Sequence, residues 1–150
     1  MREIKYKAYH KKKELLVDVL SINFEHNTVT LAIETDSDEE YYWWSGTCHL
    51  EDVELMQYTG LTDKNGKEIY ERDIVKLTVP DRHYTMQGNG YSDIMREDGF
   101  EFVGEVKFLH AMWFIKESLD GYPLIFDTNQ TLEVIGNIYQ HKHLLKENEK

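Results

Sequence analysis

The sequence predicts a mainly β protein, built as an N-terminal antiparallel β-meander followed by a second β-rich subdomain of barrel size. Two observations support this prediction. Short runs in which apolar and polar residues alternate recur along the chain, as is typical of half-buried strands. Turn-forming pairs such as Asn65-Gly66 and Asp120-Gly121 separate these runs.

The first 52 residues are expected to form the meander. The alternation predicts strands over residues 4–9, 15–20 and 29–33, with polar turns between them. Connections this short make antiparallel pairing the expected arrangement. We therefore assign residues 1–52 to an N-terminal subdomain.

The strongest turn signal lies in the stretch QYTGLTDKNGKEIYERDIV. Alternation over residues 53–58 predicts a strand, which Gly60 interrupts. Asp63 can accept a bond from its own backbone at the start of the turn, and Asn65-Gly66 tolerates positive φ angles. We expect a hairpin here, with Asp63, Asn65 and Gly66 as structural turn residues.

A second group of short strands is predicted from residue 67 onward. They are expected over residues 67–70, 74–79, 102–108, 113–116, 122–126 and 132–135. Pro80 ends one of them, and Pro123 places another at a sheet edge, because proline has no N–H for the ladder. We assign residues 53–145 to this subdomain, with a short helix or extended segment over 138–145, and 146–150 to a frayed tail.

Residues 81–99 are predicted to form a long inserted loop. Gly88-Asn89-Gly90 and Asp98-Gly99 break the strand rhythm, and charged residues are scattered between them. A loop of this length in a compact domain is typically functional or used in assembly. The glycines do not have the spacing of a nucleotide-binding fingerprint.

Three segments carry a family resemblance: YTGLTDKNGKEIYERDIV, the opening MREIKYKAYHKKKELL and the closing LEVIGNIYQHKHLL. Together they resemble the YopX-like family of phage and prophage proteins. The resemblance implies a β-rich fold with an SH3-type β-barrel, here residues 53–145, a bacteriophage origin and no established activity. The family usually has Gly at the position of Arg72, so that corner is expected to be reshaped or to carry a small backbone strain.

The charge of the chain limits its partners. A formal net charge of −11 argues against a general nucleic-acid binder, because such binding relies on Lys and Arg neutralising phosphates. The dense basic cluster of the opening comprises Arg2, Lys5, Lys7, Lys11, Lys12 and Lys13. We favour a role for these lysines in protecting a hairpin edge. Two alternatives stay open: an acidic mimic of DNA, and a weak nucleic-acid binder that uses this basic hairpin.

Four consecutive aromatic residues form the candidate interaction patch. Tyr41, Tyr42, Trp43 and Trp44 follow an acidic segment. If alternate rings point outward, they can contact a protein partner while the carboxylates line the rim. An equally good interpretation is ordinary packing. Half of the rings would then enter the core, and the others would lie along a neighbouring strand.

The residues with chemical potential do not form a catalytic pattern. Only His141 and His143 among the histidines are close enough to share a metal, and no third ligand is evident. Cys48 and His49 are adjacent, so on a strand they would face opposite sides. We predict no enzyme activity, no cofactor and no metal. A metal-dependent hydrolase built from carboxylates that meet in space is a lesser alternative.

The leading functional hypothesis is a non-enzymatic protein-interaction or assembly module in the cytoplasm of a bacterial host. It rests on the family resemblance, the missing catalytic pattern and a surface of acidic and aromatic groups. No apolar run reaches the length of a membrane span, so no membrane partner is expected. The protein partner is unidentified, the β edges favour a homo-oligomer, and the net charge disfavours nucleic acid.

Overall fold

The structure, a computed structural model, describes residues 3–32, 46–117, 120–124 and 130–146. Regular structure in these ranges is almost entirely antiparallel β, which confirms that the protein is mainly β. The chain divides into two compact units, Met1–Gly60 and Leu61–Lys150, each of which is described by itself. We call them the N-terminal unit and the C-terminal unit.

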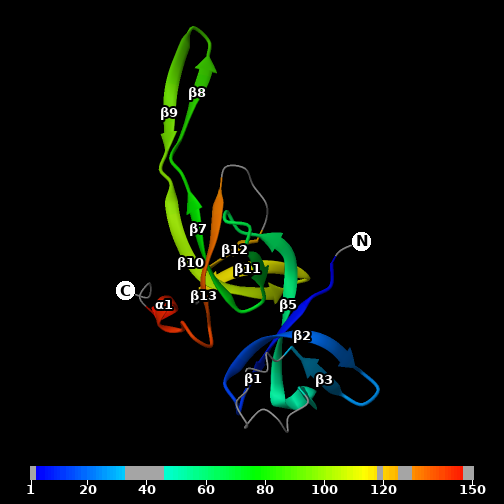
Figure 1. The fold of residues 1–150 in the computed structure, drawn as a ribbon. Helices are drawn as coiled ribbons and strands as arrows, with labels where there is room; N and C mark the ends of the chain where they lie inside the picture. The colour runs from blue at the N-terminus through cyan, green and yellow to red at the C-terminus, as the bar shows by residue number, and fades with distance from the viewer. Residues whose placement is uncertain (1–2, 33–45, 118–119, 125–129, 147–150) are drawn as a thin grey trace. The chain divides into compact units, whose positions relative to one another are not determined.

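The N-terminal unit contains the predicted meander and one further strand. Its elements are β1 (Tyr6–His10), β2 (Leu15–Asn23), β3 (Thr28–Leu31), β4 (Thr47–His49), the 3-10 helix η2 (Leu50–Asp52) and most of β5 (Val53–Thr62). Within this unit the strands are neighbours in the order β4-β3-β2-β1-β5, and Figure 1 labels β1, β2, β3 and β5. Val53 packs in the same core as Ala8, Val29 and Leu31. The N-terminal unit reaches Gly60, because β5 pairs with β1 and joins its core.

Gly60 does not end the strand as we expected. β5 continues through it to Thr62, and Gly60 has a φ of +88°, in the left-handed region that glycine adopts without a steric penalty. No heavy atom would lie within 4 Å of a Cβ at this position. The glycine is thus needed for its backbone conformation and not for space, and the two units divide directly after it.

The C-terminal unit is organised around a five-stranded sheet. The strands of this sheet are β7 (Asp73–Val79), β10 (Phe100–Leu109), β11 (Met112–Glu117), β12 (Asp120–Pro123) and β13 (Thr131–Asn137). The unit also contains β6 (Glu68–Tyr70), which lies outside this sheet, and the short helix α1 (His143–Lys146). The sheet has the order β12-β11-β10-β7-β13, and Ile69, Val75, Val106 and Ile115 are fully buried in the core.

The edges of this sheet bear on two predictions: the edge position of the strand that contains Pro123, and the closed barrel. β12 is an edge strand, as Pro123 predicted, although Asp120-Gly121 begins this strand instead of forming a separate turn. Within the described residues β12 and β13 are the two open ends of the sheet, so no closed barrel is formed. The SH3-type character of this unit is not confirmed.

The long loop predicted over residues 81–99 is wrong: this segment is a β-hairpin. It consists of β8 (Arg82–Gly88) and β9 (Tyr91–Glu97), which pair only with each other in the described sheets. Sequence alternation failed here because both faces of the hairpin are exposed, so no in-out pattern is imposed on the side chains. The overlooked signal was Asn89-Gly90, which forms the tip, with a φ of +85° at Gly90.

The buried carboxylate of Asp63 joins the turn after β5 to β13. Its Oδ1 accepts hydrogen bonds from the backbone N–H groups of Asn65 and Lys67, each at 2.9 Å. Its Oδ2 accepts the N–H of Val134 at 3.0 Å, from a residue 71 positions away in the chain. Burial by itself raises the pKa of Asp63, but the three hydrogen bonds and the charge of Lys67 outweigh it, so the pKa lies below its ordinary value.

Two further contacts hold the same turn against β13. The backbone N–H of Lys64 donates to the carbonyl of Leu132 at 2.8 Å, and the Lys64 ammonium lies 3.3 Å from the carboxylate of Glu133. Gly66 has a φ of +81°, the conformation that Asn-Gly turns require. The Asp63, Asn65 and Gly66 turn therefore acts in long-range packing as well as in the local reversal of the chain.

Arg72 occupies the corner between β6 and β7 in a left-handed conformation, with a φ of +69°. Its N–H donates to the carbonyl of Val106 at 2.9 Å, and its own carbonyl accepts the N–H of Ile138 at 3.1 Å. These bonds hold the backbone where a glycine would be unstrained. We expected either a reshaped corner or a small backbone strain at Arg72. The corner is not reshaped, and Arg72 carries the backbone strain.

We predict that Asp63→Asn lowers the free energy of unfolding by about 2–4 kcal/mol at neutral pH, because an amide cannot accept three buried N–H groups as well as a carboxylate does. The pKa is lowered in the folded state, so this stabilisation is complete above the ordinary pKa of about 3.9 and is lost as the pH falls through the lowered value. Urea unfolding from pH 7 to pH 2 measures both effects.

Asp93→Asn provides a matched control, because it makes the same change on the exposed hairpin. We expect it to change the unfolding free energy by less than about 0.5 kcal/mol. Equal effects of the two substitutions would show that the buried hydrogen bonds of Asp63 do not stabilise the fold.

We also predict that Arg72→Gly is more stable than Arg72→Ala by about 1 kcal/mol. Both variants remove the arginine side chain, and only the alanine keeps a Cβ in the left-handed conformation. Thermal unfolding of the two proteins isolates the backbone strain. An alanine variant at least as stable as the glycine variant would rule this strain out.

Candidate protein-interaction surface

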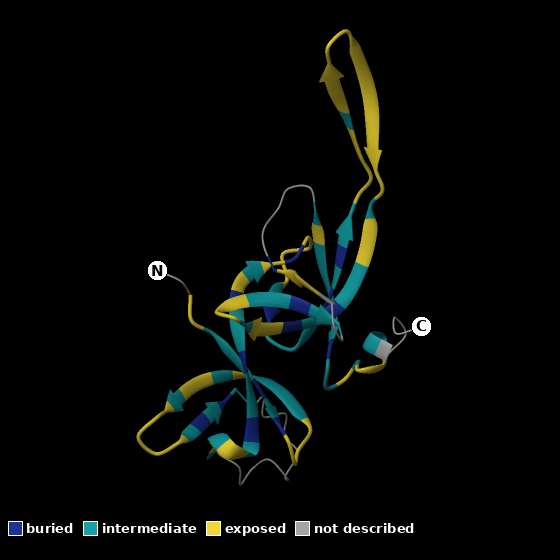
Figure 2. Cartoon of the chain, turned by 180° about the vertical axis from the view of Figure 1, so that it is seen from behind, coloured by how far each residue is buried: buried dark blue, intermediate teal, exposed yellow. Residues whose placement is uncertain are grey.

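The hairpin of β8 and β9, residues 82–97, is the most exposed β structure that the chain shows, and we call it the arm. Figure 1 shows it continuing β7 and β10 beyond the five-stranded sheet. Figure 2 shows that it is exposed along its length. Tyr84 is half-buried, and every other arm residue is exposed. The arm therefore contributes nothing to a core of its own unit.

The base of the arm is held by Asp81, directly before β8. Its Oδ1 accepts the N–H of Gly99 at 2.6 Å, and its Oδ2 accepts a bond from Arg96 Nη2 at 3.0 Å. The hydrogen bond from Gly99 is the main cause that lowers the pKa of Asp81, followed by the charge of Arg96. A Cβ on Gly99 would collide with the carbonyl oxygen of Val79. Only glycine therefore lets the two backbone segments at the base of the arm approach this closely.

The strand register divides the arm into two different faces. Cross-strand partners in an antiparallel pair project to the same side. Arg82 pairs with Glu97, Tyr84 with Met95, Met86 with Asp93 and Gly88 with Tyr91, so these residues share one face. The opposite face carries His83, Thr85, Gln87, Ser92, Ile94 and Arg96.

The first face, which we call the apolar face of the arm, presents large side chains to solvent. Met86 is 52% exposed, Tyr91 61% and Met95 39%. At its base, the Arg82 guanidinium lies 5.3 Å from the centre of the Tyr84 ring and 2.9 Å from the carboxylate of Glu97. Flexible thioethers beside aromatic rings are typical of protein-binding surfaces.

The aromatic patch proposed from the sequence cannot be compared with the arm. Tyr41, Tyr42, Trp43 and Trp44 lie outside the described residues. Both of its interpretations, partner contact and ordinary packing, therefore stay predictions.

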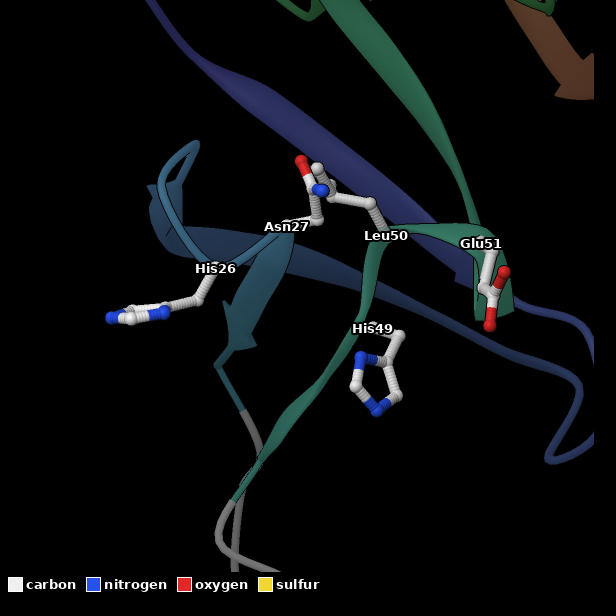
Figure 3. A pocket seen from close by; sticks show the side chains of 5 residues that line it. All are labelled: His26, Asn27, His49, Leu50 and Glu51. Carbon is white, nitrogen blue, oxygen red and sulfur yellow. The ribbon is translucent and has the colours of Figure 1, made fainter.

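A hollow of about 450 Å³ lies on the N-terminal unit and is lined by His26, Asn27, His49, Leu50 and Glu51. Figure 3 shows the side chains of His26, His49 and Glu51 pointing in different directions and not toward a common centre. In the part of the chain that the structure describes, no three His, Cys, Asp or Glu side chains are grouped to hold a metal ion. The side chains of His26, His49 and Glu51 therefore do not converge on one point in the hollow.

Cys48 and Glu105 each lie in partly buried surroundings that raise their pKa. Cys48 is half-buried against the N-terminal core, while His49 is exposed, so the two lie on opposite sides of β4 as expected. Burial raises the pKa of the Cys48 thiol, and the charge of Asp52 adds to this. Burial also raises the pKa of the Glu105 carboxyl, against the opposing charges of Lys107 and Arg72. A thiol kept protonated is a poor nucleophile.

The histidine pair and the basic hairpin are also engaged in local contacts. The rings of His141 and His143 lie 6.4 Å apart, and His141 Nδ1 accepts the N–H of Asn137 at 3.2 Å. In the opening hairpin, Lys5 lies 3.0 Å from the carboxylate of Glu3, and Lys11 donates to a backbone carbonyl at 3.1 Å. The pair of Lys5 and Glu3 offsets one of the positive charges that a nucleic-acid site would need.

Comparison with known proteins supplies the family. The family described as YopX protein matches residues 5–146. The chain belongs to the YopX family. This agrees with the resemblance found in the three sequence segments.

Solved structures with a similar fold cover nearly the whole chain of this YopX family member. Protein EF1440 from Enterococcus faecalis is 22% identical, with a TM-score of 0.54, over 97% of this chain and 99% of its own. Protein yopX from Bacillus subtilis is 21% identical, with a TM-score of 0.51, over 96% and 98%. At these identities the likeness concerns the fold alone. The search of curated proteins found no match, and no helix among the described residues is long and apolar enough to cross a membrane.

We predict that the arm can be removed without unfolding the protein. Val79 and Phe100 are direct partners across β7 and β10, so a two-residue Asn-Gly connection can replace residues 80–99. Because no arm residue is buried, the free energy of unfolding should change by less than about 1 kcal/mol. Urea unfolding measures the change, and a loss above about 2 kcal/mol would mean that the arm supports the fold.

Proposed function

We propose that this YopX family member is a non-enzymatic protein-interaction and assembly module, and that the arm is the part that contacts its partner. The setting we propose is the cytoplasm of a bacterium that carries a phage or prophage. The observation that supports the proposal is the apolar face of the arm, where Met86, Tyr91 and Met95 stand in solvent.

The physical argument concerns the stability of such an arm. A two-stranded hairpin with no core of its own is marginally stable in water. The arm has this form, yet its base is fixed by Asp81, Arg96 and Gly99. An anchored base with exposed apolar residues beyond it is suited to a surface that a partner covers, since contiguous exposed apolar groups favour association.

The chemistry of the rest of the described chain agrees with a binding role. The side chains lining the hollow of the N-terminal unit diverge, and Glu105 and Cys48 have pKa values shifted by burial rather than by a catalytic neighbour. The lesser alternative of a metal-dependent hydrolase therefore has no named residues to support it. The net charge of −11 continues to disfavour direct binding of nucleic acid.

The proposal is tested by comparing the whole chain with the arm-excised variant described above. Each tagged protein is incubated with a lysate of the bacterial host, and retained proteins are quantified by mass spectrometry. We expect the whole chain to retain a specific protein, or untagged copies of itself added to the lysate. The arm-excised variant should retain at least about tenfold less, as expected when an interface loses its central anchors.

The retained protein is then purified and its affinity measured by calorimetry against both chains. Equal affinity for the whole and arm-excised chains would overturn the role of the arm. Retention of neither another protein nor a second copy by the whole chain would overturn the proposed function itself.

A further inference from the structure

We propose that the apolar face of the arm packs against the same face of a second copy of this chain. This inference rests on the proposed function and names the partner of that surface. Its starting point is the contrast in charge between the arm and the rest of the chain.

The arm is electrically neutral in a strongly acidic protein. Residues 82–97 contain Arg82 and Arg96, balanced by Asp93 and Glu97, whereas the chain as a whole carries −11. Two copies of the chain repel each other over most surfaces, because like charges raise the free energy of association. The arm provides a surface on which the contacting residues of a second copy add no net repulsion of their own.

The charges on the apolar face are arranged so that the face complements itself. Arg82 and Glu97 are direct partners across the two strands. If two arms stack about a two-fold axis parallel to their strands, β8 of one copy lies over β9 of the other. Each Arg82 then lies opposite Glu97 of the other copy, which is the isologous arrangement of a symmetric dimer.

The apolar positions agree with the same stacking. The register places Tyr84 opposite Met95 of the other copy, in both directions, giving two contacts between a thioether and an aromatic ring. Asp93 meets Met86 of the other copy and not the second Asp93. No pair of like charges therefore faces across the arm contact, so the stacking adds no repulsion between directly opposed residues.

The size of the arm sets the expected affinity. Strands of seven residues are about 23 Å long at about 3.3 Å per residue. A contact of that length offers less area than the roughly 1,600 Å² of a standard interface, which is the size class of weak and transient contacts, and we expect association in the micromolar range. The dimer should therefore form and dissociate reversibly with concentration.

Two neighbouring residues give a matched pair of variants for the test. Met95→Glu places a carboxylate on the apolar face, and Ile94→Glu places the same group on the opposite face. Ile94 is 79% exposed and Met95 only 39%, so a general effect of surface hydrophobicity would make Ile94 the more important residue. Self-association through the apolar face makes Met95 the more important one.

The experiment is sedimentation velocity of the full chain, both variants and the arm-excised chain, from about 1 to 300 μM, a range that brackets micromolar dissociation constants. The whole chain should move with concentration from 17.8 kDa toward twice that mass. Met95→Glu should weaken the dimer by at least about tenfold, and Ile94→Glu by less than about threefold. The arm-excised chain should remain a monomer.

A whole chain that stays at 17.8 kDa over this range would overturn the proposal. An equal effect of Met95→Glu and Ile94→Glu would overturn it as well, since the two faces would then be equivalent. The experiments distinguish failure of this inference from failure of the proposed function. A monomeric chain whose arm is still needed to retain another protein would disprove the self-contact and leave the interaction role intact.

Discussion

The C-terminal unit depends on one buried carboxylate. Asp63 accepts three backbone N–H groups, two from its own turn and one from Val134 of β13. Strand β13 pairs with β7, and β7 pairs with β10. These last two strands lead into the arm. The side chain that closes a local turn therefore also fixes an edge strand of the sheet from which the candidate interaction surface extends.

Several residues of the fold adopt unusual backbone conformations or allow close backbone contacts. Gly60 and Gly66 adopt positive φ angles without strain, while Arg72 adopts one with a side chain attached. Gly99 has a different reason: its missing Cβ allows the strands at the base of the arm to approach. The strained backbone of Arg72 and the close approach at Gly99 persist because the surrounding hydrogen bonds hold the backbone at both residues.

The candidate surface was only partly accessible to sequence reasoning. Segment 81–99 was correctly set apart from the core, but its strands were missed because exposed strands lack an apolar side. Arm residues such as Met86 and Met95 look like ordinary scattered hydrophobic residues until the register places them on one face. The sharing of that face by Tyr84 and Met95, which are eleven positions apart, follows only from cross-strand pairing.

The amino-acid sequence by itself determined the mainly β class, the opening meander, the hairpin at Asn65-Gly66 and membership of the YopX family, because these depend on local alternation, turn chemistry and short motifs. Only the tertiary structure decided which strands are neighbours, that Val53 belongs to the first core, and that Asp63 reaches Val134. The physical reason is that these contacts join residues distant in the chain. Such contacts form where burial and hydrogen bonding are satisfied together, and no local pattern records that result.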